Sequence, residues 1–402
     1  MSGATTSSLL TPAFFADPYP TYHELQQHDP LHWSEAMSAW YVTRYRDVLA
    51  LLREPRLSNN RTAGLLRGLS PEELQEFEPL RKFLNHWLVF TDPPTHTRLR
   101  ALLTRVFPPR LTEAMRPKIV ALLDELLDAA AARGQLQVMN DLAYPLPAFI
   151  VGELLGARRE DRELIRAWSD DMILFGPGRY TTDTLRLIQN AFVNMTNYFA
   201  EILDSGRTTP DTITHQLLQV EAEGERLDRD ELLAICTMMM FAGHETTMNL
   251  VANGILTLLR HPDQLRLLQN NPELIEPCVE ELLRYESPVQ NISRSVLEDF
   301  EYGGVTIRKG QRVVLSVGAA NRDPEQFNEP DRFDIQRNQS RHLSFAYGIH
   351  FCLGAPLARM EGQLALSTLL QRFPKLHAPD QEITWKPLML VREMTEMTVE
   401  LQ

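Results

Sequence analysis

A cysteine stands between two glycines in the apolar stretch FAYGIHFCLG, which covers residues 345–354. Gly348 and Gly354 can take a positive φ angle, or let another group approach the main chain closely, where a side chain would be strained. The loop can then wrap over the sulfur of Cys352. A thiolate removed from bulk water needs amide N–H donors, a positive neighbour or a metal to remain ionised. The pattern therefore suggests a thiol that the backbone presents for chemistry, although a lone cysteine in a turn is more often buried and inert.

The three cysteines, Cys236, Cys278 and Cys352, are widely spaced, so they suggest no disulfide framework and fit a reducing compartment. A structural zinc site needs four ligands, and Cys352 has no partner nearby in the sequence. Iron in a porphyrin needs only one protein ligand on its proximal side, where a thiolate pushes electron density towards O–O cleavage. The residue types thus favour a porphyrin iron over zinc.

The complete pattern Phe-x-x-Gly-x-His-x-Cys-x-Gly, followed by APLARME at 355–361, resembles the ligand loop and next helix of the cytochrome P-450 family of heme-thiolate monooxygenases. The resemblance implies that Cys352 is the axial ligand of the iron in heme b (iron protoporphyrin IX) and that O₂ is the co-substrate. It implies that Phe345, Gly348 and Gly354 contact the cofactor. It also implies a mainly α fold with smaller β regions, in which a helical bundle with a long central helix surrounds the heme, as a single domain over residues 1–402.

Residues 242–247 read AGHETT within a long, nearly apolar segment. Small side chains at Ala242 and Gly243 let a flat ligand lie close to the backbone, and Thr246 can bond back to a carbonyl one turn earlier and bend the helix. Glu245 is costly in apolar surroundings unless it has partners. From the residues alone, a satisfied polar cluster is an equally good interpretation.

The same six residues resemble the family's oxygen-activating motif Ala-Gly-x-Glu-Thr. The resemblance implies that Thr246 hydrogen-bonds the bound dioxygen while Glu245 relays protons from solvent, a positioned transfer that is typically worth about 10²–10⁴-fold in rate. Having both residues indicates reductive oxygen activation and argues against the peroxide-dependent branch of the family. Ala242 is expected to lie against the heme.

His96 and Arg100 lie four residues apart on one face of an expected helix, so they suit an anionic group. Without the resemblance, surface charge would be the better interpretation. The resemblance implies that both residues contact heme propionates, together with Arg294 and His342. His350 cannot be a second ligand, since two bonds to one face of the iron are geometrically impossible, and a packing or propionate role is expected for it.

Glu281 and Arg284 share a helix face at i, i+3, where such a pair is usually solvated and worth about 0.2–0.5 kcal/mol. The family pairs this motif with an arginine further along the chain. Arg332, in the segment PDRF, occurs in the right order. The resemblance therefore implies that these three residues form a buried structural triad that braces the cysteine loop.

Helical spacing selects Ile235, Met239 and Ala242 for the pocket side of the central helix. The resemblance stresses Met238, Phe241 and Ala242 instead. Ordinary core packing is an equally good interpretation for each pocket candidate, and the expected substrate is a hydrophobic small molecule of the terpenoid, steroid, fatty acid or polyketide class, to be hydroxylated or epoxidised. The other candidates implied by the resemblance are mostly apolar: Leu88, Val89, Phe90, Leu174, Phe175, Val289 to Ile292, Met389 and Leu390.

The chain has 402 residues and a formal net charge of −13, which argues against nucleic acid as a partner. Residues 1–16 have neither a basic start nor the apolar run of roughly 20 residues that spans a bilayer, so a soluble, cytoplasmic monomer without a membrane partner is expected. No Gly-x-Gly-x-x-Gly follows a strand, so electrons should come from a separate ferredoxin or flavodoxin with its reductase. A basic patch is expected to attract this acidic partner, formed by Arg98, Arg105, Arg110 and Arg359.

Two other functions remain open beside oxygen insertion. A non-catalytic heme-thiolate sensor or carrier would use the same loop without needing the acid–alcohol pair. A family member with atypical chemistry, such as oxidative phenol coupling or dehydration, is also consistent with these motifs. One departure from the family pattern is Glu393, which stands where many bacterial relatives place the glycine of an Arg-Gly pair, so a different turn is expected there.

A mostly helical chain must position these residues. The long central helix is expected from about Asp228 to Leu259, and its apolar residues all round predict a buried position. Three- and four-residue apolar spacing predicts other helices at 19–27, 46–53, 99–106, 111–132, 147–155, 159–174, 181–205, 212–221 with Asp211 as N-cap, 273–286 and 360–373. Strands are expected in a hairpin at 31–33 and 40–43, at 293–296, 302–307 and 312–317, and within 382–401, with an irregular meander over 321–341.

Overall fold

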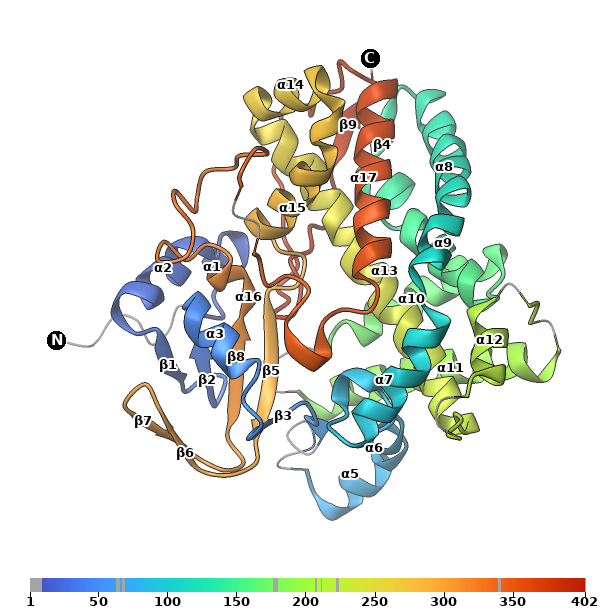
Figure 1. Ribbon diagram of the computed structural model, residues 1–402. Helices are drawn as coiled ribbons and strands as arrows, with labels where there is room; N and C mark the ends of the chain where they lie inside the picture. Colours follow the sequence, from blue (N-terminus) through green and yellow to red (C-terminus); the bar gives the residue numbers. More distant parts are fainter. Residues whose placement is uncertain are drawn as a thin grey trace.

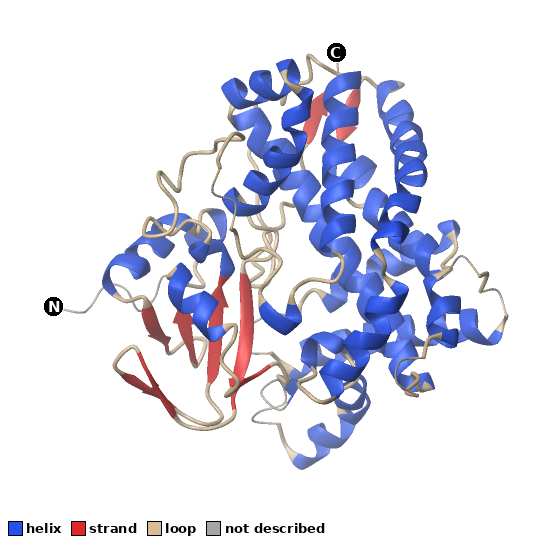
Figure 2. Ribbon diagram, viewed as in Figure 1, coloured by secondary structure: helices blue, strands red, loops and turns tan. Residues whose placement is uncertain are grey.

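The computed structural model describes residues 9–62, 66, 69–175, 180–206, 208–210, 212–221, 224–338 and 341–401. Helices make up most of this chain and gather on the right of Figures 1 and 2 around the long helix α13 (Arg229–Arg260). The main sheet lies on the left, where N-terminal segments meet strands from the second half of the chain. The expected mainly α architecture with smaller β regions is confirmed. Among the described residues, no helix is both long and apolar enough to cross a membrane.

Before α13, the helices are α1 (Pro12–Ala16), α2 (Tyr19–His28), α3 (Tyr45–Leu51), α5 (Pro71–Glu76), α6 (Glu78–Leu84), η1 (Leu88–Phe90), α7 (Thr95–Val106), α8 (Pro109–Ala131), the π-helix η2 (Val138–Ala143), α9 (Pro145–Leu155), η3 (Arg159–Asp161), α10 (Arg162–Met172), α11 (Thr182–Asp204) and α12 (Ile213–Gln219). After it come α14 (Pro262–Asn270), η4 (Pro272–Leu274), α15 (Ile275–Tyr285), α16 (Val317–Ala320), η5 (Gly348–His350) and α17 (Ala355–Arg372).

The main sheet has five strands in the spatial order β1 (Leu31–Ser34), β2 (Ala39–Val42), β8 (Arg312–Ser316), β5 (Asn291–Val296) and β3 (Leu57–Ser58). Strands β2 and β8 run parallel and the other neighbours run antiparallel, so the expected hairpin of β1 and β2 is confirmed. Two further pairs stand apart from this sheet: β4 (Gln135–Gln137) with β9 (Thr398–Glu400), and β6 (Phe300–Tyr302) with β7 (Val305–Ile307).

One strand prediction is wrong and another is only partly confirmed. The expected strand at 302–307 is broken, because Gly303 and Gly304 take φ angles of +58° and +84° and turn the chain back on itself. The expected strands within 382–401 reduce, among the described residues, to β9 and to isolated bridges. Glycine adopts positive φ without strain, so the Gly-Gly pair indicated a turn between two strands rather than a position inside one strand.

Helix starts show which local signals were missed. Helix α5 was not expected, although Ser70 and Glu73 form a capping box at its start. Helix α17 begins earlier than expected, at Ala355, with a proline in its first turn. Asp211, the expected cap of α12, lies outside the described residues, and the side chain of Thr212 accepts the cap hydrogen bond.

Helix α13 begins where its cap predicts. The Asp228 side chain accepts a hydrogen bond from the Glu231 amide at 2.8 Å, and the Glu231 carboxylate accepts one from the Asp228 amide at 3.1 Å. This reciprocal capping satisfies two amide groups that a helix start otherwise leaves without partners. The helix is buried along most of its length and packs against α9, α11 and α17, inside the largest apolar core. It is therefore the rigid element against which a site can be built.

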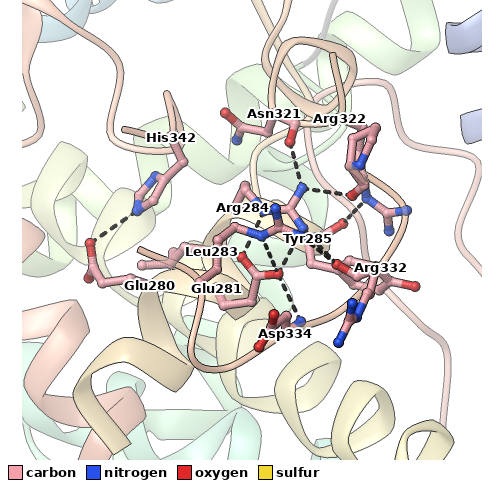
Figure 3. A network of polar contacts seen from close by, with 12 residues as sticks. Glu280, Glu281, Leu283, Arg284, Tyr285, Asn321, Arg322, Arg332, Asp334 and His342 are labelled. Atoms are coloured by element: carbon pink, nitrogen blue, oxygen red, sulfur yellow. Dashed lines mark hydrogen bonds and ion pairs between the residues drawn. The ribbon is translucent and has the colours of Figure 1, made fainter. Parts of the chain in front are cut away.

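A buried network ties α15 to the irregular segment after α16 (Figure 3). The Glu281 carboxylate accepts hydrogen bonds from Arg284 at 2.7 and 2.8 Å and from Arg337 at 3.0 Å. Arg284 also donates to the carbonyl oxygens of Asn321 at 2.9 Å and Pro330 at 2.8 Å. Buried charges cost desolvation unless their hydrogen-bonding groups are satisfied, and here one carboxylate and two guanidinium groups satisfy each other and the backbone.

The third member of the triad is Arg337, and the expectation of Arg332 is wrong. The Arg332 side chain is 59% exposed and pairs with Glu329 at 3.2 Å on the surface. Only its backbone takes part, since the carbonyl oxygen of Arg332 accepts from Arg284 at 3.3 Å and from Arg337 at 2.8 Å. The Arg337 side chain is 9% exposed. Arg332 therefore lies beside the triad but points away from it (Figure 3).

The same network reaches the chain that leads into the cysteine loop. Asn321 accepts from the Leu343 amide at 2.7 Å and donates to the Ser344 hydroxyl at 2.8 Å. The Ser344 hydroxyl in turn donates to the carbonyl oxygen of Leu283 on α15 at 2.6 Å. The loop that begins at Phe345 is thus anchored on a buried helix.

We expect Arg337→Ala to lower the free energy of unfolding by about 2–3 kcal/mol, because it breaks a buried network and leaves carbonyl oxygens without donors. Arg332→Ala, a surface change close by, should alter it by less than about 0.5 kcal/mol. The urea midpoints of the two variants, compared with that of the parent protein, measure this difference. An equal loss in both variants would show that the Arg332 side chain does bear on the triad.

Candidate functional site

The cysteine loop is bent by two residues with positive φ. Ala346 has a φ of +58° and Gly348 a φ of +76°, and the Cys352 amide donates back to the carbonyl oxygen of Phe345 at 3.0 Å. The expected need for glycine at 348 is confirmed. Gly354 has an ordinary φ of −81°, and a Cβ placed there would meet only the Cys352 sulfur, at 4.0 Å. The loop therefore delivers the sulfur to the first turn of α17.

Backbone amides and one arginine surround the sulfur. Cys352 is exposed on its outer side, yet the neighbouring protein desolvates the sulfur, and this burial raises the pKa of the thiol. The amides of Gly354 and Ala355 and the charge of Arg100 act in the opposite direction. A coordinated metal removes the proton from a thiol outright. The described residues hold no group of three or more His, Cys, Asp or Glu side chains that could bind a metal ion, so Cys352 suits a metal that takes one protein ligand.

Arginine and histidine side chains gather near this loop. The rings of His96 on α7 and His350 lie 4.1 Å apart between their centroids. Arg294 on β5 donates to the Ser293 carbonyl oxygen at 3.0 Å, and Arg61 donates to the Ser293 hydroxyl at 3.2 Å. Three nitrogens of this cluster are buried and find no hydrogen-bond partner among the described residues: Arg61 Nε, His96 Nε2 and His350 Nε2. Buried donors without acceptors indicate that this cluster is built to receive one.

The pKa values of this cluster point to the same need. Burial, reinforced by the neighbouring positive charges, lowers the pKa of His350 to about 3 and that of Arg61 to about 9. Burial also lowers the pKa of Arg294 to about 10, and that of Arg100 falls for the same reason. Positive charges that lie close together without enough anions disfavour their charged forms. A bound carboxylate would stabilise those charged forms again.

An open hollow of about 520 Å³ lies beside these cations. Its lining comes from α7 and the cysteine loop and consists of His96, Thr97, Arg100, Ala101, Thr104, Arg105 and Ile349. A single thiol ligand, unpartnered donors for anionic groups and adjoining space are what a porphyrin with two propionates requires. The residues present fit such a group.

One stripe of α13 is open where the rest of its middle is buried. Met239, Ala242, Gly243 and Thr246 keep exposed surface at helical spacing, and the Thr246 hydroxyl donates to the carbonyl oxygen of Ala242 at 2.9 Å. The predicted back-bond of Thr246 is therefore present. A Cβ on Gly243 would come within 2.9 Å of Val151, so this glycine serves the close packing of α13 on α9 as well.

Glu245 points into the protein from the same helix. Its carboxylate lies 3.2 Å from His244 Nε2, and its second oxygen, Oε2, is buried without a partner. Burial lowers the pKa of His244, but the charge of Glu245 together with hydrogen bonds to Glu245 and the Met240 carbonyl oxygen outweighs burial, so the net shift is upward. The two side chains therefore have different surroundings: the acid Glu245 is enclosed by protein, and the alcohol Thr246 lies on the open stripe.

His342 is not among the cations of the cluster, which corrects the expected propionate contact. It is 2% exposed and its Nε2 lies 3.2 Å from Glu280 (Figure 3). Its Nδ1 accepts from the Ser344 amide at 3.3 Å. Both ring nitrogens are therefore occupied by the protein itself. His350, expected to have a packing or propionate role, lies in the cluster, and Arg61 is a member that no sequence motif predicted.

The pocket candidates separate by burial. Leu88, Phe90, Met238 and Phe241 belong to the main core, and Met389 packs in a different core beside α2 and the sheet, so Met389 is corrected. Of the helical-spacing choice, Met239 and Ala242 lie on the open stripe, whereas Ile235 is buried in the core like Met238 and Phe241. An isolated bridge joins Val289 to Val391. Candidates that keep exposed surface are Val89, Leu174, Phe175, Met239, Ala242, Val289, Ile292 and Leu390.

The expected basic patch is partly neutralised. Arg98 pairs with Glu231, Arg359 pairs with Glu280 at 2.5 Å, and Arg105 donates to the carbonyl oxygen of Glu221 at 2.8 Å. Arg110 is exposed. The patch is therefore weaker than four free arginines would make it.

Comparison with known proteins bears on the whole chain. The family model for cytochrome P450 matches residues 73–396. The chain is 37% identical over 395 residues to the biotin biosynthesis cytochrome P450 of Bacillus subtilis (strain 168), covering 98% of each. It is also 37% identical over 405 residues to the vitamin D(3) 25-hydroxylase of Pseudonocardia autotrophica, covering 99% of this chain and 97% of the relative.

Solved structures agree. A crystal structure of P450BioI in complex with an acyl carrier protein ligated to hexadec-9Z-enoic acid has a TM-score of 0.89 and 37% identity, covering 97% of this chain and 99% of the other. The similarity thus extends over the cysteine loop, the central helix and the sheet together. With its thiol loop, its cation cluster and its acid–alcohol helix, the chain belongs to the cytochrome P450 family of heme-thiolate monooxygenases.

Proposed function

We propose that this monooxygenase holds heme b with Cys352 as the axial ligand of the iron, and that Thr246 and Glu245 manage the protons of O₂ activation. The observation that carries the proposal is the set of buried, unpartnered nitrogens on Arg61, His96 and His350, close to the presented thiol. Charge-assisted hydrogen bonds from such donors to carboxylates are the strong ones.

In this proposal the protein binds, orients and protects. The heme, when bound, supplies the chemistry that splits O₂ and transfers one oxygen atom to the substrate. His96, Arg100, Arg294 and His350 hold the propionates, while the amides at the start of α17 stabilise the charge on the Cys352 sulfur. The Thr246 hydroxyl, tied to Ala242, keeps oxygen lone pairs free to accept a hydrogen bond on the open side of α13.

We propose a hydrophobic substrate of the fatty acid, steroid, terpenoid or polyketide class. Support comes from the open stripe of Met239 and Ala242 and from Val289, Ile292 and Leu390 on the facing segments. Methionine adapts to irregular apolar ligands. The names of the relatives cited above, a vitamin D(3) hydroxylase and a P450 with an acyl carrier protein, indicate lipophilic substrates for those proteins.

Electrons come from a redox partner, and we propose a ferredoxin or flavodoxin with its reductase, acting on a monomer. Two of the four arginines, Arg98 and Arg359, pair with carboxylates, but a paired guanidinium can still attract an acidic surface at low ionic strength. The partner would meet the Arg110 and Arg359 side of the molecule.

Carbon monoxide tests the ligand. The reduced, heme-loaded protein should show the strongly red-shifted absorption band typical of thiolate ligation, because the sulfur of Cys352 donates charge to the iron. Cys352→Ala should lose this band, whereas Cys278→Ala, which removes a buried thiol on α15, should keep it. Retention of the band in Cys352→Ala would exclude this residue as the ligand.

Thr246→Ala tests proton management. Oxygen and reductant should still be consumed, but product per electron should fall at least about tenfold and peroxide should rise, since positioned proton transfer is worth about 10²–10⁴-fold. Thr246→Ser keeps the hydroxyl and should recover most of the yield. The measurement is the ratio of product to peroxide under turnover. An unchanged ratio in Thr246→Ala would rule out the proposed role.

Heme retention tests the corrected propionate contacts. Arg100→Ala should weaken heme affinity at least about tenfold, because a hydrogen bond between charged groups contributes about 1.5–3 kcal/mol. His342→Ala should leave affinity within about twofold, since its ring is bound to Glu280 and Ser344. Rates of heme transfer to a scavenger protein measure both. The correction fails if His342→Ala releases heme as readily as Arg100→Ala.

A further inference from the structure

A second buried carboxyl lies near Glu245. Glu393 is 3% exposed and lies on the C-terminal segment, which α13 holds through a hydrogen bond from Asn253 to the Arg392 carbonyl oxygen at 2.9 Å. A hydrogen bond from the Lys386 amide to the Glu393 carbonyl oxygen at 2.9 Å closes the turn. The departure from Arg-Gly noted in the sequence thus places an acid beside the central helix.

A charged path leads from Glu393 to the surface. Lys386 Nζ lies 2.5 Å from Glu393 Oε1 and 3.5 Å from Asp170 Oδ1 on α10. The side chains become more exposed in that order, from 3% at Glu393 to 35% at Lys386 and 48% at Asp170. The enclosed carboxyl therefore has a direct polar connection to water.

Glu245 and Glu393 are arranged alike. Each has one oxygen beside a nitrogen, His244 Nε2 for Glu245 and Lys386 Nζ for Glu393. Among the described residues, the second oxygen of each, Oε2, is buried without a partner. A buried carboxylate oxygen without a donor is costly, and a proton on one of the two acids removes that cost.

The charges that face these acids favour one proton between them. Burial, and then the negative charge of Glu245, raise the pKa of Glu393 to about 7, although Lys386 acts against this shift. Two carboxyls whose surroundings keep one protonated near neutral pH are the usual signature of acid–base work. The titratable and charged groups that face Glu393 are Glu245, Lys386 and Asp170, and those around Glu245 are His244, Tyr144 and, over the Tyr144 ring, Arg166.

We propose that Glu393 is the proton store of this enzyme: it passes its proton to Glu245 and is recharged from solvent beside Lys386 and Asp170. The proton leaves the Glu393 carboxyl and arrives on the Glu245 carboxylate. Glu393 is then a carboxylate paired with the Lys386 ammonium, until it takes a proton from bulk water. The inference rests on the proposed proton role of Glu245 and extends it by a positioning residue that does not touch the oxygen site.

Infrared spectroscopy tests the store without turnover. Between about pH 5 and pH 9, the protein should show a buried carboxylic acid C=O band that titrates near neutral. Glu393→Gln should abolish it, and Glu245→Gln should keep it but move its midpoint to lower pH, because a negative neighbour is gone. Glu361, whose pKa burial raises to about 8, contributes a second band, so all spectra are recorded in a Glu361→Gln background.

Turnover tests the route. Product per electron in Glu393→Gln should fall at least about fivefold near pH 7.5, since positioned proton transfer is worth about 10²–10⁴-fold, and the solvent deuterium isotope effect should grow. Glu393→Asp, which keeps a titratable carboxyl, should recover part of the yield. A purely structural role would instead lower heme content and stability without changing the isotope effect.

The outcomes separate the two proposals. If Glu245→Gln loses yield and Glu393→Gln does not, the store is wrong while the role of Glu245 stands. If neither variant loses yield, both proposals fail. Should Glu393→Gln not fold, the infrared midpoint in Glu245→Gln decides, because a midpoint that does not move would overturn the coupling of the two acids.

Discussion

The structure depends on one buried carboxylate, Glu281, which accepts hydrogen bonds from two arginines that belong to different parts of the chain. A buried ion pair contributes little net stability, but its directional bonds fix geometry. Here Arg284 and Arg337 turn an irregular segment into a fixed support, and Asn321 passes that support to the start of the cysteine loop. The position of a single sulfur atom relative to α13 follows from this chain of contacts.

Charge is separated around that sulfur in a way that matches the chemistry. On the side of the cysteine loop and α7, buried nitrogens of Arg61, His96 and His350 lack hydrogen-bond partners among the described residues. Beside α13, Glu245 and Glu393 each have a buried carboxylate oxygen without a partner among the described residues. In the proposed function, the first set binds the carboxylates of the cofactor and the second set supplies protons.

What the sequence could predict was local. The loop around Cys352 and the length of α13 follow from residue spacing and caps, which act over a few residues. The predictions failed for side chains in irregular segments. Arg332 was predicted for the triad but Arg337 occupies that place, and Met389 was predicted for the pocket but lies in a core. No periodicity tells which way a side chain points in such a segment. The roles of Arg61 and Glu393 depend on contacts with residues that are distant in the sequence, so local patterns could not predict them.

Gly243 shows how little freedom the central helix has. A methyl group at this position would reach the Val151 side chain at 2.9 Å, closer than ordinary packing allows, so Val151 or α9 would have to shift. The short distance between α13 and α9 is therefore possible because residue 243 carries only a hydrogen atom as its side chain. In a redesign of this cavity for other molecules, the side chain at position 239 can change in size. A larger side chain at position 243 would instead disturb the packing of α13 on α9.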